Sequence, residues 1–453
     1  MLKEEKKIKI GKIAMSRAQM ITLGFFLIIM TGTLLLMLPI STREGQSTSF
    51  IGALFTATSA TCVTGLVTYD TFLHWTYFGQ VVILIMIQIG GLGFITLGVY
   101  GMMLLRKKIG LKSRELIHDS LNSMHVGGGV RLVKFILSGT FIFEFTGALI
   151  LSMRFIPEYG LLKGVYFGIF HAVSAFCNAG FDLMGEQGAY SSFCNYVGDI
   201  TINVVIMLLI IIGGIGFSVW SDVYKNKLHV KKYMLHTKIV LITTLVLLVG
   251  GTVFFWISES RGIFADMGFK DKLLASAFSS VTPRTAGFNT VDTAALSDAG
   301  KAVTMLLMFI GGSPGSTAGG IKTTTVAAIV FFIMAYIKKE KGCNVFRRRI
   351  DDDLIKKAST VFFVNASLAI AAILVITLNQ NISLVDASFE VFSALGTVGM
   401  TTGITRDLTV LSKLVIVFLM FCGRVGSLSF AVSFLDRKRV PDMRYPTEDV
   451  IIG

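Results

Sequence analysis

The stretch FTATSATCVTGL, residues 55–66, recurs three more times in the chain in altered form. The other versions are FHAVSAFCNAGF at 170–181, FSSVTPRTAGF at 278–288 and FEVFSALGTVGM at 389–400. Each version starts with Phe, carries Ser or Thr four residues later and ends in Gly followed by a large apolar residue. The glycines, Gly65, Gly180, Gly287 and Gly399, are 115, 107 and 112 residues apart. A repeat at this period predicts four structural units of about equal size.

The composition indicates an integral membrane protein. The chain has 453 residues, of which 53% are hydrophobic and 15% charged, and its mean hydropathy is +0.71. No water-soluble domain has such a balance. The net charge of +14 does not indicate nucleic acid binding, because the basic residues form short blocks between apolar runs. The five cysteines include no CxxC pair, so neither a zinc site nor a disulfide framework is expected.

Eight apolar segments are long enough to cross the ~30 Å hydrocarbon core of a bilayer. They are 18–40, a segment within 72–105, 135–153, 200–221, 239–258, 302–337 with a break, a segment starting near 358, and 414–435. The first is expected to be a retained span and not a signal peptide, because its apolar run is too long. One copied stretch lies between each odd and even segment and is too short to cross by itself.

Irregular backbone at membrane depth has to be buried in protein or line a water-filled cavity, so the four copied stretches are expected to share a central cavity. We therefore predict an all-α polytopic membrane protein with eight transmembrane helices and four re-entrant pore helices. They would form four consecutive span–pore loop–span repeats around a pseudo-fourfold central pore. The predicted repeats are 18–106, 131–225, 236–340, whose second span is broken, and 356–436, with a cytoplasmic N-terminal segment 1–17 and a cytoplasmic tail 437–453.

The distribution of Lys and Arg predicts the orientation. Of the 42 such residues, 30 lie in the termini and in the connections from even to odd segments. Positive loops stay in the cytoplasm. Both termini are therefore expected on the cytoplasmic side, and the copied stretches are expected to enter the membrane from outside.

The side chains before each repeated Gly differ, whereas the Gly and its spacing are constant. This indicates that the backbone has the shared function. Glycine permits left-handed backbone at no steric cost, and rings of carbonyl oxygens can replace the hydration shell of a monovalent cation. The alternative is four tight turns in which Gly is needed only for packing. The candidate ion ligands are the carbonyls of Cys62, Val63, Thr64, Gly65, Cys177, Asn178, Ala179, Gly180, Arg284, Thr285, Ala286, Gly287, Gly396, Thr397, Val398 and Gly399.

Acidic residues follow the four glycines: Asp70, Asp182, Asp292 and Asp407. Carboxylates around a pore mouth concentrate cations. The alternative is that they cap the next helices, as Asp often does. The two roles are compatible.

The sequence GGSPGSTAGGIKTTT, 311–325, cannot hold a regular helix because it contains five glycines and a proline. We expect it to line a cavity. It lacks the Gly-Lys adjacency and the βαβ context of a phosphate-binding loop, so ATP binding is not expected. The glycine clusters 90–93 and 213–216 in the first two even segments are expected to permit close helix contact.

Arg424 lies about midway through the last segment, where a charge costs ~2.5–3.5 kcal/mol. It is predicted to be a positive barrier in the pathway that holds the 311–320 loop through carbonyls, or else an ion pair with Glu144 or another helix. Lys322 either lines the pathway or extends to the cytoplasmic interface. Of the remaining polar residues, Glu144, Gln88 and Asn365 are expected to form interhelical hydrogen bonds, and His171 to pack behind the copied stretch.

These motifs resemble the Trk/Ktr/HKT superfamily of cation transporters, most closely the membrane subunit of bacterial Ktr potassium uptake systems. The resemblance covers nearly the whole chain and is carried by 62–66, 178–181, 282–289, the loop at Gly311 and 444–446. It implies that four glycines form a K⁺ filter with K⁺ at the carbonyls, and that Ser at the first glycine position accompanies Na⁺ selectivity. It implies a gate made of Gly311, Gly312, Ser313, Pro314, Gly315, Ser316, Thr317, Ala318, Gly319, Gly320 and Arg424.

The resemblance further implies K⁺ uptake across the plasma membrane by a homodimer with one pore per subunit. A cytoplasmic ring of RCK-type nucleotide-binding subunits would regulate it. The chain has no Rossmann-type region, so a nucleotide would bind the partner, and no cofactor is expected in this chain. The basic loops 225–232 and 347–349 would meet that ring or anionic lipid. Symport with Na⁺ is left open.

Two other functions fit less well. A membrane-embedded enzyme would need catalytic acids or histidines in the membrane, but the six His residues form no HExxH motif and no Asp pair lies in a span. A proton-coupled carrier with inverted repeats would need units of opposite topology.

Overall fold

The structure is a computed structural model that describes residues 8–10, 13–93, 96–99, 129–427, 430, 446 and 448. The first half of the described chain contains helices α1 (Arg17–Leu36), α2 (Phe50–Thr61), α3 (Thr71–His74), α4 (Tyr77–Leu92), α7 (Gly129–Tyr159), α8 (Leu161–Phe176), α9 (Ile200–Ile215) and α10 (Phe217–Asn226). The second half contains α11 (Leu235–Ser258), α12 (Phe269–Val281), α13 (Asp298–Phe309), α14 (Thr323–Ile337), α15 (Asp352–Asn379), α16 (Leu384–Gly396) and α17 (Val410–Val425).

The strands are two short antiparallel hairpins, β1 (Ile8–Ile10) with β2 (Ile13–Met15), and β3 (Asn344–Val345) with β4 (Arg348–Arg349). Short 3₁₀ helices are η1 (Pro39–Ser41), η2 (Met184–Gln187), η3 (Cys194–Tyr196), η4 (Val230–Lys232) and η5 (Ile404–Asp407). The ends of the predicted repeats 18–106 and 356–436, most of 1–17 and 437–453, and the motif residues Arg444 and Tyr445 lie outside the described residues.

The predicted all-α membrane architecture is confirmed, but the lengths of the helices differ from those predicted. Among the described residues, the helices 18–36, α7, α11 and α15 are apolar and long enough to cross a membrane. The helices between them are shorter: α4, α9 and α17 have 16 residues each, and α13 and α14 have 12 and 15. The even segments are therefore not continuous spans within the described residues.

Glycine clusters end the even helices at corresponding points. The predicted span 200–221 is apolar and long enough only as a bent pair, because α9 and α10 meet at an angle of 94° at Gly216, whose φ is +105°. Helices α4 and α17 likewise end before Gly93 and Gly426, with φ of +79° and +93°. The expectation that the first two clusters only permit close contact was incomplete, since glycine at positive φ also breaks the helix. The predicted break after α13 is confirmed.

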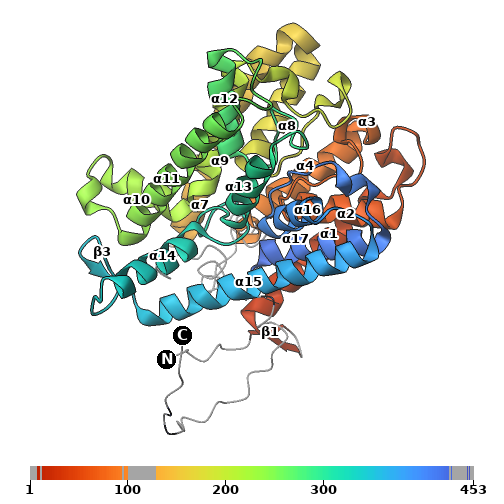
Figure 1. Ribbon diagram of the computed structural model, residues 1–453. Coiled ribbons are helices and arrows are strands. Elements are labelled where there is room, and N and C mark those ends of the chain that lie inside the picture. Colours follow the sequence, from red (N-terminus) through yellow and green to blue (C-terminus); the bar gives the residue numbers. More distant parts are fainter. Residues whose placement is uncertain are drawn as a thin grey trace.

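The helices close into a ring. Consecutive groups of helices touch through α4 with α8, α9 with α12, and α13 with α16, and the last helix, α17, packs on α2. In Figure 1, α1, α2, α16 and α17 accordingly lie together although they come from opposite ends of the chain, and α15 runs along one side of the molecule. The short helices α2, α8, α12 and α16, which carry the copied stretches, are thereby surrounded by the others.

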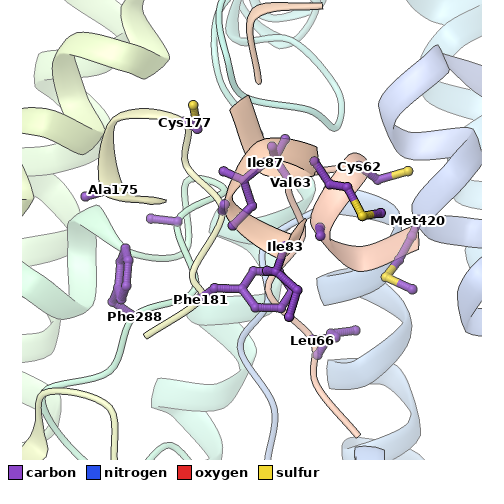
Figure 2. Packing of buried hydrophobic residues seen from close by; sticks show 14 of the residues in the cluster. Cys62, Val63, Leu66, Ile83, Ile87, Ala175, Cys177, Phe181, Phe288 and Met420 are labelled. Carbon is purple, nitrogen blue, oxygen red and sulfur yellow. The ribbon is translucent and has the colours of Figure 1, made fainter. Parts of the chain in front are cut away.

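The largest apolar cluster surrounds the copied stretches. Figure 2 shows Cys62 and Val63 beside Ile83 and Ile87 of α4, with Met420 of α17 nearby. All five of these side chains are buried. The four stretches are therefore fixed by packing from behind.

Helix α8 packs closely on α7 through two glycines one turn apart. A Cβ at Gly164 would lie 2.7 Å from the backbone of Ile156, and one at Gly168 would lie 2.7 Å from the backbone N of Ser152. Small residues at this spacing let helix backbones approach in membranes. This contact sets the position of the second copied stretch, which follows α8 directly.

We predict that Gly168→Leu lowers the melting temperature of the purified protein, because forced overpacking typically costs about 1–3 kcal/mol. Gly250→Leu is the matched control, since a Cβ at Gly250 on α11 would meet nothing within 4 Å. The measurement is thermal unfolding in detergent followed by size-exclusion chromatography. Equal shifts for the two variants would contradict the assigned contact.

Candidate functional site

The repeated Ser or Thr anchors each copied stretch at its glycine end. Its hydroxyl bonds either the N–H of the repeated Gly or the carbonyl of the residue after it. The bonds are Gly65 N to Ser59 Oγ (3.0 Å), Gly399 N to Ser393 Oγ (3.1 Å), Ser174 Oγ to Phe181 O (2.7 Å) and Thr282 Oγ1 to Phe288 O (2.6 Å). The backbone carbonyl of the same residue accepts from the residue just before each Gly, at 2.8–2.9 Å. The sequence showed these hydroxyls as part of the repeat but not what they do.

The four segments 62–65, 177–180, 284–287 and 396–399, called segments 1 to 4, share an unusual backbone. Each has positive φ at its Gly, from +70° to +96°, and again two residues earlier. The earlier residues are Val63, Asn178, Thr285 and Thr397, with φ of 50°, 58°, 73° and 51°. A β-branched residue at positive φ is a genuine outlier, and such strain costs about 1–3 kcal/mol and persists only where the surroundings fix it. Left-handed residues at alternate positions turn successive carbonyls toward the same side of the chain.

The four glycines meet in a closed ring. A Cβ at Gly65 would approach the carbonyl oxygen of Ala179, the residue before Gly180. The same relation joins Gly180 to segment 3, Gly287 to segment 4 and Gly399 to segment 1, and in every case the distance would be 2.6 Å or less. No side chain fits at these four positions. The structure therefore brings together the four glycines that the repeat singled out, which we call the glycine ring.

A cavity of about 70 Å³ lies against the glycine ring. All four ring glycines line it, together with Asp70, Asp182, Tyr190, Ser192, Asn289, Thr401, Thr405 and Arg406 among others. We call it the outer cavity. The guanidinium of Arg406 lies 4.4 Å from the centre of the Tyr190 ring. No sequence signal indicated Tyr190, Ser192 or Arg406, because they lie 7 to 12 residues beyond a repeated glycine in loops without a motif.

Two of the four predicted mouth carboxylates line the outer cavity. Asp70 also caps α3, accepting from the N–H groups of Phe72 and Leu73 at 2.9 and 2.8 Å, so both predicted roles apply to it. Burial, assisted by the nearby Asp70 carboxylate, raises the pKa of Asp182 to about 7. Asp292 and Asp407 are exposed and are not among the lining residues.

The 311–320 loop, which the family resemblance implies is a gate and which we call the gate loop, fills the break between α9 and α10. Its base is closed by a parallel bridge between Ile310 and Ile321. The N–H groups of Ser313 and Thr317 donate to the carbonyls of Gly214 and Gly213 at 3.0 and 3.2 Å, and Phe217 N donates to Gly315 O at 2.7 Å. The helix breaks in the second and third units thus supply each other's missing hydrogen-bond partners.

Arg424 bonds to carbonyls and not to Glu144. Its guanidinium donates to the carbonyl of Thr317 in the gate loop and to the carbonyls of Gly90 and Gly91 at the end of α4, the last at 2.9 Å. The expected contact with a carbonyl of the 311–320 loop is therefore present, whereas an ion pair with Glu144 is not among the contacts of the described residues. Arg424 ties the fourth unit to the gate loop and to the first unit at once.

The sequence singled out two further basic residues, Lys322 and Arg284. Lys322 Nζ turns back onto the gate loop and donates to the carbonyls of Ala318 and Gly319 at 2.7 and 3.2 Å. Arg284 points away from the ring, since it is 6% exposed and its guanidinium contacts Thr244 of α11.

The expected interhelical hydrogen bonds of Gln88, Glu144 and Asn365 are confirmed. His171 is fully buried and bonds the backbone at Phe167 and Leu183, so its predicted packing role is also confirmed.

The chain is similar to known cation transport proteins. The chain matches the TrkH family, described as a cation transport protein, over residues 3–441. It is 43% identical over 446 residues to the potassium/sodium uptake protein NtpJ of Enterococcus hirae, which covers 97% of this chain and 98% of that protein. It is 44% identical over 437 residues to the Ktr system potassium uptake protein B of Bacillus subtilis, with 96% of each chain covered.

Among solved structures, the potassium transporter TrkH from Vibrio parahaemolyticus superposes with a TM-score of 0.73. The match covers 93% of this chain and 85% of that chain at 16% sequence identity. At this identity the likeness shows the fold alone, which is that of a polytopic helical membrane protein.

Proposed function

The chain belongs to the TrkH family of cation transport proteins, and on that premise we propose that it takes up K⁺ across the plasma membrane through the glycine ring. The observation that carries the proposal is the ring itself. Four backbones at alternating positive φ converge where no side chain fits, as a carbonyl-lined passage requires. The K⁺ ligands would be the carbonyls of segments 1 to 4. The names of the relatives, which include potassium uptake proteins, support K⁺ as the substrate.

The gate loop would close the pathway below the ring. Its backbone is held by carbonyl and N–H partners that can exchange, and Arg424 adds a positive charge that disfavours a cation beside it. Moving Arg424 away from Thr317 would break the link that Arg424 makes between the loop and the first unit.

We also propose an orientation in the membrane and an assembly with other subunits. The four units 18–106, 131–225, 236–340 and 356–436 would each place their copied stretch at the outer side, with both termini in the cytoplasm. The protein would work as a homodimer with a cytoplasmic ring of RCK-type nucleotide-binding subunits, and Na⁺ would accompany K⁺ if the system is a symporter. The name of the Bacillus subtilis relative, a component of a Ktr system, supports a partner.

Gly65→Ser should lower the ratio of K⁺ to Na⁺ uptake by about tenfold, equivalent to ~1.4 kcal/mol. A Cβ at Gly65 would lie 2.5 Å from the Ala179 carbonyl oxygen and would push segments 1 and 2 apart. The measurement is K⁺, Rb⁺ and Na⁺ uptake into proteoliposomes. Gly160→Ser is the control, because Gly160 has similar backbone, with φ +79°, but a Cβ there would meet nothing within 4 Å. A selective wild type with an unchanged Gly65→Ser variant would exclude the ring as the filter.

Arg424→Gln should raise the K⁺ flux by up to about tenfold, because hydrogen bonds to a charged group contribute about 1.5–3 kcal/mol each. Lys356→Gln, which removes a charge from a side chain that is 81% exposed on α15, should leave the flux unchanged. Flux is measured in proteoliposomes at matched protein content. Unchanged or lower flux in a folded Arg424→Gln protein would rule out the gate.

Uptake should depend on the external pH through Asp182. Its raised pKa, about 7, means that it is largely protonated at pH 6 and charged at pH 8. The apparent KM for K⁺ should therefore fall by about threefold from pH 6 to pH 8, as the outer cavity becomes more negative.

One other carboxyl beside the outer cavity has a raised pKa. Burial raises the pKa of Glu390 to about 7, and Glu390 accepts hydrogen bonds from Thr401 and Thr405, which line the cavity. Burial raises the pKa of the Cys194 thiol to about 11, above the range of the experiment. Asp182→Asn should abolish the dependence, whereas Glu390→Gln and Asp292→Asn should retain it. A pH profile that survives in Asp182→Asn would assign the effect to another group.

A further inference from the structure

The gate loop contacts the glycine ring's own segments as well as its neighbours below. The Thr317 hydroxyl donates to the carbonyl of Phe176, the last residue of α8, at 3.1 Å. It also lies 3.4 Å from the side-chain amide of Asn178, the left-handed residue of segment 2. Thr317, Asn178 and Phe176 are all fully buried. One side chain of the gate loop therefore supports the position where segment 2 leaves its pore helix.

A second contact reaches segment 4. A Cβ at Gly319 would lie 2.9 Å from Cγ2 and 3.1 Å from Cβ of Thr397, and closer still to its hydroxyl. Thr397 is the left-handed residue of segment 4, and its buried hydroxyl has no hydrogen-bond partner among the described residues. Next to it, a Cβ at Gly320 would lie 3.0 Å from the carbonyl oxygen of Gly396. The loop backbone is thus packed directly against segment 4 with no side chain between them.

Segments 2 and 4 are opposite each other in the glycine ring, because the ring contacts run from Gly65 to Gly180, Gly287, Gly399 and back to Gly65. The gate loop therefore touches two facing sides of the ring through their strained left-handed residues. Such residues hold their conformation only while their surroundings fix them. Withdrawing the loop would remove a support from both sides together.

We propose that the gate loop is a positioning element for the filter, so that its place beneath segments 2 and 4 sets ion selectivity as well as flux. With the loop in place, Thr317 and Gly319 fix the two left-handed residues and hence the separation of the facing carbonyls. When the loop moves, segments 2 and 4 relax and the preference for K⁺ over Na⁺ falls. This inference rests on the proposed function, in which the ring is the filter and the loop is the gate.

The first test uses two changes of the Thr317 side chain. Thr317→Val removes the hydroxyl and keeps the shape, whereas Thr317→Ser keeps the hydroxyl. The ratio of K⁺ to Na⁺ uptake in proteoliposomes should fall by at least about threefold in Thr317→Val and stay near wild type in Thr317→Ser, since contacting residues couple by about 0.5–3 kcal/mol.

Ser316→Ala is the control within the loop. Among the described residues, its hydroxyl bonds only the loop backbone, at Ser313 O and Ala318 N, and makes no hydrogen bond with segments 2 or 4. It should change flux without changing the ratio. A ratio that falls equally in Ser316→Ala and Thr317→Val would overturn the proposal, because any loosening of the loop would then have the same effect.

The second test is a double-mutant cycle across the other contact. Gly319→Ala would collide with Thr397 and should lower the ratio. In Gly319→Ala/Thr397→Ala the two nearest atoms of Thr397, its hydroxyl and Cγ2, are removed and only Cβ remains, at 3.1 Å, so the ratio should move back toward that of Thr397→Ala alone. Effects of the two changes that simply multiply would show that the loop and segment 4 are independent, and would overturn the proposal.

The outcomes distinguish a failure of the proposed function from a failure of the coupling between the gate loop and the filter. If wild-type proteoliposomes show no preference for K⁺ over Na⁺, the proposed function fails. If the wild type is selective and the Thr317 and Gly319 variants change only the flux, the proposed function survives and the coupling of gate to filter is wrong. Size-exclusion profiles identify any variant that does not fold, and Thr317→Val then carries the test, since it changes no volume.

Discussion

Backbone-to-backbone contact among four glycines is the constraint on which the rest of the structure depends. Each ring glycine lies so close to the carbonyl before the next one that a methyl group would not fit. Because membrane depth offers no water to irregular backbone, the protein must supply the remaining hydrogen-bond partners. The anchoring hydroxyls and the carbonyls of the same Ser and Thr residues do so from behind. The short helices α2, α8, α12 and α16, the helices around them and the apolar cluster hold these four segments in place.

Below the ring the four units cease to be equivalent. Within the described residues, the even helices are interrupted at glycine, and the third alone carries a loop that fills its neighbour's interruption. Only the fourth carries an arginine, and its charge at membrane depth is compensated by three carbonyls from other parts of the chain. Those carbonyls are available because the helices that own them have ended. The helix breaks and the buried arginine are therefore explained together.

The sequence was sufficient for the copied stretches, which fold onto short helices, and for the break at 311–320, because each has a local signal in spacing or in glycine content. It was not sufficient for the positive φ of Val63 or Thr397, since β-branched residues rarely adopt it and only the surroundings enforce it. The bend at Gly216 was missed because a glycine cluster is compatible with close packing and with a helix end alike. For Arg424, the need for a partner followed from its depth, but the carbonyls of Gly90 and Gly91 lie more than 330 residues away and carry no signal.

The three residues before each ring glycine have a different sequence in each of the four segments. The backbone nevertheless has positive φ at the same two positions in all four. In a channel assembled from four identical chains, any change at such a position would appear four times around the axis, and an arginine like Arg424 would bring four like charges together. Here a single polypeptide supplies all four quarters, so each can be altered by evolution or by protein engineering without altering the other three. Because the four quarters belong to one covalent chain, they need not be identical, although the glycine ring at the centre keeps its fourfold arrangement.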